Sequence, residues 1–104
     1  MLALGFSEDE DVMIGNARLV VKQLKGPRAA KLRYETEHMD KEFDIVETRD
    51  AELSPYVVVS VGLPKTEYQI TLCFDAPRNV QITRGSLYRK WGNSHSNPNK
   101  KPAR

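Results

Sequence analysis

The fold is easiest to predict from residues 68–91, YQITLCFDAPRNVQITRGSLYRKW. The first seven residues alternate between large apolar side chains and Gln, Thr or Cys, a period of two that is typical of a half-buried β-strand. Residues 75–79 break this alternation with an Ala-Pro turn, because proline fixes φ and Asp and Asn favour turns. Val80 and Ile82 then alternate with polar residues, which predicts a second short strand that ends at Arg84.

A short helix is predicted to follow this second strand. Leu87 and Trp91 are four residues apart, so on a helix they share one face. Ser86 is a suitable N-terminal cap, and Gly92 is a suitable end. The predicted order for the C-terminal part is therefore strand, tight turn, strand ending in arginine, and short helix.

The N-terminal part also has strand patterns. Strands are predicted at residues 1–6, 12–14 and 17–25. Gly15 and Asn16 form a turn pair between the second and the third strand. The acidic residues 7–11 are expected to form a solvated loop.

The middle of the chain, residues 27–67, adds further strand patterns at 30–35, 43–49 and 56–61. Two interpretations of this segment stay open. It is either an insertion into a small β domain or part of a degenerate tandem copy, in which Arg18 to Arg49 corresponds to Tyr56 to Arg84.

Length and composition indicate one small domain or two very small ones, and we place one β domain at residues 1–91. Residues 76–104 contain seven basic residues and no acidic one, whereas the preceding 75 residues carry an excess of acids. Such an uneven charge is expected where one end of a protein meets an anion such as RNA, or where a basic tail is simply solvated. Residues 92–104 have no large apolar side chain and are expected to form a disordered basic tail.

Other features exclude several classes of protein. No apolar run reaches the roughly 18–20 residues that a membrane-spanning helix needs. The first residues lack the basic start and long apolar core expected of a signal peptide. The single cysteine, Cys73, rules out an internal disulfide and fits a reducing cytoplasm. The two histidines lie in unrelated polar stretches, and no metal-ligand spacing or phosphate-binding glycine loop is present. We therefore predict a protein that is not an enzyme and that uses no cofactor and no metal.

Two blocks of the chain resemble the carbon storage regulator family (CsrA/RsmA). The C-terminal block has Ala76-Pro77, the pattern Val80-x-Ile82-x-Arg84 and then Leu87-Tyr88. The N-terminal block has MLAL at residues 1–4, VMIGN at 12–16 and VVKQLKG at 20–26. The resemblance covers residues 1–26 and 68–91 and leaves the middle segment without a counterpart.

The resemblance implies a small sheet or barrel of short antiparallel strands, mainly β, with a short C-terminal helix. Members of this family are homodimers with interleaved strands, in which the first strand of one subunit lies beside the last strand of the other. They bind GGA motifs in hairpin loops of messenger RNA leaders and regulate translation. The RNA-binding positions that the resemblance implies for this chain are Leu4, Gly5, Phe6, Pro77, Arg78, Ile82, Thr83 and Arg84.

The first strand departs from the family pattern. Where the family has basic residues after the leucine, this chain has Gly5-Phe6-Ser7 and then four acids. Each lost phosphate contact weakens RNA binding, so we expect arginine at positions 6 and 7 to strengthen it. Phe6 either stacks on a base or lies buried, and both possibilities stay open. The alternatives to an RNA-binding regulator are a relative that has lost RNA affinity and acts through a protein partner, and a β module with an unrelated role.

Overall fold

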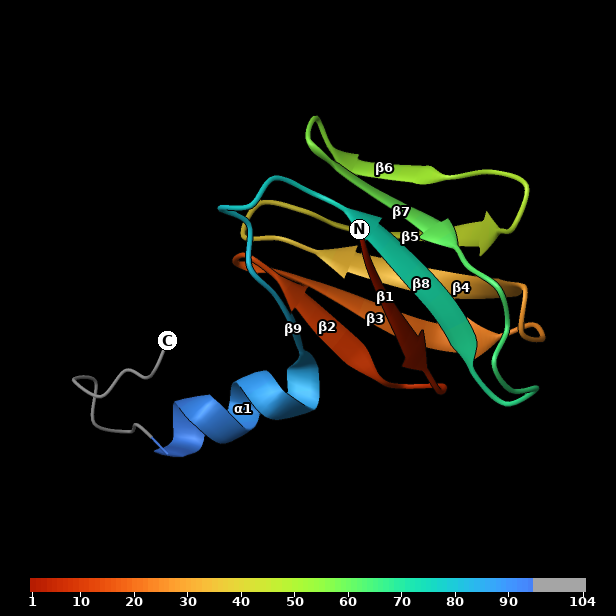
Figure 1. The fold of residues 1–104 in the computed structure, drawn as a ribbon. Coiled ribbons are helices and arrows are strands. Elements are labelled where there is room, and N and C mark those ends of the chain that lie inside the picture. The colour runs from red at the N-terminus through yellow and green to blue at the C-terminus, as the bar shows by residue number, and fades with distance from the viewer. Residues whose placement is uncertain (95–104) are drawn as a thin grey trace.

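A computed structural model describes the backbone of residues 1–94 and the side chains of residues 1–90 (Figure 1). The described residues form nine strands and one helix. The strands are β1 (Leu2–Phe6), β2 (Asp11–Ile14), β3 (Ala17–Leu24), β4 (Ala29–Glu35), β5 (Asp40–Val46), β6 (Ala51–Ser54), β7 (Val57–Val61), β8 (Ile70–Asp75) and β9 (Ile82–Arg84). The helix is α1 (Gly85–Ser94). The prediction of a mainly β fold of short antiparallel strands with one short helix is confirmed.

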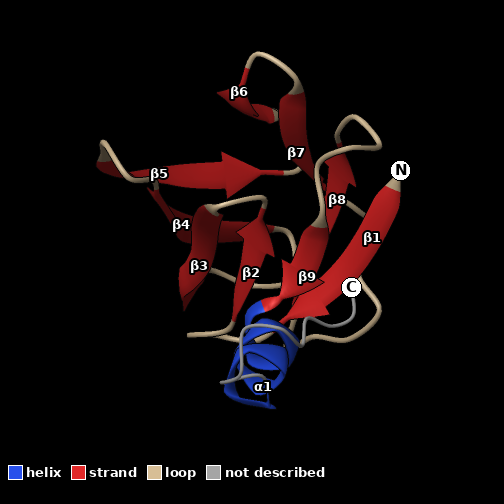
Figure 2. Cartoon of the chain, turned by 90° about the vertical axis from the view of Figure 1, so that its left-hand side faces the viewer, coloured by secondary structure: helices blue, strands red, loops and turns tan. Residues whose placement is uncertain are grey.

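The strands form two antiparallel sheets, with orders β1-β8-β7-β6 and β5-β4-β3-β2-β9. In Figure 1 the first sheet lies in front of the second. The inner faces of both sheets supply one hydrophobic core, which includes Phe6, Leu19, Leu32, Ile45, Val59, Leu72 and Phe74. The last strand, β9, leads directly into α1 at one end of this two-sheet body (Figure 2).

The alternating patterns that predicted strands correspond to buried faces. In β8 the apolar residues Ile70, Leu72 and Phe74 are all buried. In β4 the same alternation buries Ala30, Leu32 and Tyr34. Both strands occupy interior positions of their sheets, between two hydrogen-bonded neighbours. Because successive side chains of a strand point to opposite faces, the alternation in sequence determines which face packs against the core.

The first strand pairs within its own chain. β1 lies antiparallel to β8, with Leu2 opposite Phe74 and Phe6 opposite Ile70. The homodimer is an expectation from the resemblance, in which the first strand of one subunit lies beside a strand of the other. Here β8 of the same chain covers one edge of β1, so that pairing needs no second chain.

Several boundaries differ from the prediction. Tyr68 is 79% exposed and precedes β8, and Val80 precedes β9. Asp11 belongs to β2 and is buried, so the acidic segment is not wholly a solvated loop. The sequence did not predict β6, because its four residues include only one buried apolar side chain, Leu53.

The C-terminal helix begins at Gly85 and runs past Gly92 to Ser94. It is one residue earlier at its start and two residues longer at its end than predicted. The expected contact involving the Trp91 side chain, and residues 95–104 of the expected disordered tail, lie outside the described part of the chain.

Candidate nucleic-acid interface

The first and the last strand belong to different sheets and are not hydrogen-bonded to each other, but the Arg84 side chain of β9 reaches the backbone of Gly5 in β1. We call this region, residues 2–6 of β1 and 82–84 of β9, the β1–β9 seam. Each of these strands is the outermost strand of its sheet. One backbone edge of each strand therefore has no ladder partner, and its N–H and C=O groups can bind another molecule.

Arg84 joins the two strands. Its Nη1 atom donates a hydrogen bond to the backbone oxygen of Gly5, at 2.9 Å. Its guanidinium carbon lies 5.1 Å from the centroid of the Phe6 ring, a cation–π arrangement. Among the described residues, Arg84 forms no ion pair. The guanidinium is thus held in place by neutral groups and keeps its positive charge for an external anion.

Phe6 supports this arginine from inside the core. Its side chain is 1% exposed and meets the Phe74 ring edge to face, with centroids 6.4 Å apart. The ring cannot stack on an RNA base, so the stacking interpretation is wrong and the buried one is correct. For the same reason, arginine at position 6 would put a charge into the core, which is destabilising. At the half-buried position 7, the prediction that arginine strengthens binding stands.

The other implied positions differ in accessibility. Thr83 is 8% exposed, which leaves little of its side chain for direct contact with RNA. Leu4, Gly5 and Ile82 are half-buried, whereas Pro77 and Arg78 are exposed in the loop before β9. The structure therefore brings Arg84 to Gly5 and Phe6, and it places Ile82 and Pro77 in one groove with Leu2. Arg78 lies in the loop outside that groove.

A groove occupies one end of the seam. It has a volume of about 310 Å³ and is lined by Met1, Leu2, Phe74, Ala76, Pro77, Val80 and Ile82. These lining side chains are all apolar, and Met1 and Leu2 are exposed. The surface exposed in the groove is nevertheless mainly polar. The seam thus runs from this groove at the start of β1 to the Arg84 guanidinium at its end.

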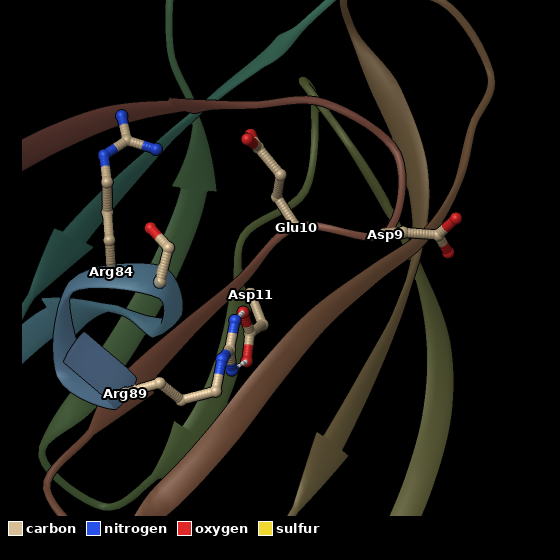
Figure 3. Close-up of a pocket in the computed structure, with 6 residues that line it drawn as sticks. Asp9, Glu10, Asp11, Arg84 and Arg89 are labelled. Atoms are coloured by element: carbon tan, nitrogen blue, oxygen red, sulfur yellow. Dashed lines mark hydrogen bonds and ion pairs between the residues drawn. The ribbon is translucent and has the colours of Figure 1, made fainter. Parts of the chain in front are cut away.

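A buried carboxylate lies beyond Arg84. The Asp11 side chain is 2% exposed and accepts hydrogen bonds from Arg18 Nε at 2.7 Å and from Arg89 Nη1 and Nη2 at 2.8 and 3.0 Å (Figure 3). The Arg89 hydrogen bond is the main reason why the pKa of Asp11 is lowered, with Arg18 adding to it and burial opposing it. Figure 3 shows Arg84 pointing away from this cluster.

Asp11 also packs against the start of α1. A Cβ atom on Gly85, the first helical residue, would collide with the Asp11 carboxylate. The carboxylate therefore lies at the positive end of the helix dipole, where negative charge is favourable. Sequence reasoning missed this role, because Asp11 closes a run of four acids. The only available signal was its position directly before the apolar Val12.

The rest of the acidic segment is also ordered. Glu8 accepts a hydrogen bond from the backbone N–H of Leu24 at 2.9 Å, and Glu10 accepts one from that of Ser7 at 2.7 Å. Asp9 has a left-handed backbone with φ of 71°, and its N–H donates to the Val21 carbonyl. These bonds fix the segment beside β3. Its negative charge disfavours a bound anion on this side of Arg84.

Comparisons with known proteins add no relationship: neither the known protein-family models, nor the curated proteins, nor the solved structures contain a match to this chain. Within the described residues, no cluster of three or more His, Cys, Asp or Glu side chains is arranged to hold a metal ion. The helix found in residues 1–94 is too short and too polar to cross a membrane.

Proposed function

We propose that this chain is an RNA-binding regulator of translation that takes a GGA-containing hairpin loop of a messenger RNA leader at the β1–β9 seam. One observation carries the proposal. Arg84, the arginine that ends the family-like pattern, meets the first strand through Gly5 and Phe6 and has no acidic partner among the described residues.

The chemistry of the seam suits single-stranded RNA. Bases in a hairpin loop are unstacked and expose their pairing edges, which backbone groups of an open strand edge can bind. β1 and β9 are each an outermost strand with one open edge, and the Arg84 side chain links them through the Gly5 carbonyl. A guanidinium between them can contact both phosphate and base.

The charge near the seam supports the same proposal. Residues 76–90 contain Arg78, Arg84, Arg89 and Lys90 and no acid. Arg78 and Lys90 are exposed and close in sequence to the seam, so they add attraction for phosphate that salt would screen. In this proposal the protein is not an enzyme, needs no cofactor and acts in the cytoplasm, where leaders of messenger RNA are translated.

The test is a binding titration with a hairpin RNA that carries GGA in its loop, and with the same hairpin in which CCA replaces GGA. Arg84→Ala should weaken binding to the GGA hairpin by about 1–3 kcal/mol, or roughly 5- to 150-fold. Arg49→Ala is the matched control, because Arg49 is an exposed arginine in the turn after β5. It should leave the affinity within about twofold, near the ±0.5 kcal/mol expected of a neutral surface change.

Each result has a definite meaning. Thermal unfolding of both variants must be measured as well, so that a loss of folding is not counted as a loss of binding. Equal affinity for the two hairpins, or equal effects of the two substitutions, would contradict the proposal. The alternative, a relative that has lost RNA affinity and acts through a protein partner, would then be preferred.

A further inference from the structure

The strand pairing repeats itself within the chain. β2, β3 and β4 form consecutive antiparallel pairs, and so do β6, β7 and β8. The strand before each group crosses to the other sheet. β1 pairs with β8, the last strand of the second group, and β5 pairs with β4, the last strand of the first. This reciprocal exchange is the pattern of a two-fold symmetric pair of interleaved units.

The register supports the same conclusion in detail. Leu19 lies opposite Tyr34, and exactly 40 positions later Val59 lies opposite Phe74, with all four side chains buried. Two-residue turns join β2 to β3 and β6 to β7, again 40 positions apart. This spacing differs from the alignment of Arg49 with Arg84 that the sequence suggested. Arg49 lies between β5 and β6 and ends no strand of the β9 type.

The exchanged strands correspond as well. Phe6 of β1 lies opposite Ile70, and Ile45 of β5 lies opposite Ala30. All four of these residues are buried. By this register, Phe43 takes the place of Leu4, and both pack against the core while half-buried. Thus β5 is the second unit's first strand.

We call β1–β4 the first unit and β5–β9 the second unit. Only the second unit has a fifth strand, which is β9. The second unit continues from β8 to β9, which pairs with β2. The first unit continues from β4 through residues 36–39 directly into β5, so no such strand follows β4. Consequently β6, the counterpart of β2, has β7 as its only neighbour in the described sheets. A seam with both a first and a fifth strand is therefore formed once, between β1 and β9.

The charge of the incomplete side also differs. The register puts Asp44 of β5 in the place of Gly5, since Gly5 lies opposite Thr71 and Asp44 opposite Lys31. Residues 40–52 contain six acids and two bases. This negative charge would repel phosphate from the β5 side. Because no strand like β9 follows β4, that side also has no counterpart of Arg84.

We infer that the chain is an interleaved pair of like units folded as one monomer, in place of the homodimer that the resemblance implies, and that it has one RNA site, at the β1–β9 seam. The second side lacks both the strand and the charge that a second site would need. The number of sites rests on the proposed function, whereas the monomeric architecture does not.

The architecture can be tested without RNA. Ala3 lies directly opposite the single cysteine, Cys73, in the β1–β8 pair. Opposed residues in antiparallel strands have Cα separations that a disulfide can span. Oxidised Ala3→Cys protein should therefore form a disulfide within one chain and keep a mass of about 11.8 kDa under non-reducing conditions. The double variant Ala3→Cys/Cys73→Ser is the control that cannot form this disulfide.

The other outcomes would overturn the architecture. A covalent dimer of Ala3→Cys would mean that β1 pairs with β8 of another chain. Failure to form any disulfide would contradict the β1–β8 register. Sedimentation of the unmodified protein should also give the monomer mass, and a dimer mass at micromolar concentration would count against the inference.

The number of sites is measured by titrating the GGA hairpin at concentrations well above Kd. One RNA per chain is expected, and Arg84→Ala should remove all of the specific binding rather than half of it. Two RNA molecules per chain, or one RNA per two chains, would overturn the single-site inference. Absence of any binding would instead contradict the proposed function and, with it, the site, while the disulfide result would still decide the architecture.

Discussion

Two arginines five positions apart, Arg84 and Arg89, have opposite environments. Arg89 makes two hydrogen bonds to one buried carboxylate, that of Asp11, at 2.8 and 3.0 Å. Arg84 rests on a ring and a carbonyl oxygen and has no acidic partner among the described residues. Arg89 therefore stabilises the fold through an ion pair, whereas the charge of Arg84 stays available to bind an anion.

This difference separates the basic residues of the C-terminal segment into two kinds, those that stabilise the fold and those whose charge stays available for binding. A positive charge that is neutralised by a buried carboxylate contributes to stability, because separating the pair would leave the carboxylate poorly solvated. A positive charge that is positioned by neutral groups has lost little of its ability to bind phosphate. Three substitutions test this division, beginning with the largest expected effect.

Asp11→Asn should reduce the free energy of unfolding by about 3 kcal/mol, since it removes the charge that two arginines share. The cost is at the low end for a buried pair, because the Arg18 and Arg89 side chains are 39% and 56% exposed and can be hydrated. Chemical denaturation checks the value. Asp9→Asn is the control: it makes the same change at an exposed, left-handed position that asparagine tolerates. Equal losses in the two variants would contradict the structural role of Asp11.

The same pair predicts a pH dependence. The pKa of Asp11 is lowered in the folded protein, mainly by the Arg89 hydrogen bond. Its stabilising contribution is therefore complete above the ordinary value of 3.8 and is lost as the pH falls through the lower folded-state pKa. The difference in unfolding free energy between wild type and Asp11→Asn should stay constant above about pH 5, where the unfolded-state carboxyl is ionised as well, and should shrink below pH 3.8.

Gly85→Ala should destabilise the protein by about 1–3 kcal/mol, because the added methyl group collides with the Asp11 carboxylate. In an ordinary helix the same change is stabilising, so the sign of the effect is informative. Ser86→Ala, one position later and exposed, is the control and should change stability by less than about 0.5 kcal/mol. Thermal unfolding measures both, and a stabilised Gly85→Ala protein would show that Asp11 does not lie against the helix start.

Phe6→Leu should have the smallest effect on binding. The substitution removes the aromatic ring that lies against the Arg84 guanidinium. If this cation–π contact positions the guanidinium, its loss should weaken RNA binding by about 0.5–1 kcal/mol. Phe74→Leu removes the partner ring, which is equally buried but is not the ring beneath Arg84. It should lower stability to a similar extent while leaving the RNA affinity of the folded protein unchanged. Identical RNA affinities for both variants would contradict a role of Phe6 in positioning Arg84.

The sequence predicted those parts of the fold that local patterns determine. The alternation in β4 and β8 and the Gly15-Asn16 turn fixed strands with the correct buried faces. It did not reveal β6, which is short and bulged between Glu52 and Ser54. Nor did it reveal which strands pair across the sheets, because pairing depends on contacts between distant residues.

The candidate site was predictable only in part. Arg84 and its neighbours were found from their resemblance to a known pattern, and the structure brings Arg84 to Gly5 of the same chain. The burial of Phe6 could not be decided from one strand, since an apolar residue at a strand end fits either face. Asp11 was missed because a run of acids resembles a solvated loop until the arginines that reach it are known.

The pairing of β1 with β8 has a consequence for how the protein is made. Leu2 lies opposite Phe74, so the strand that is synthesised first must wait for the strand that is synthesised nearly last. Contacts this distant in sequence slow folding, because a long loop must be closed before they form. During translation β1 stays without its partner until β8 has left the ribosome. A chain that is released before residue 70 would have an unpaired first strand and a core without Leu72 and Phe74, and it should be prone to aggregation and degradation.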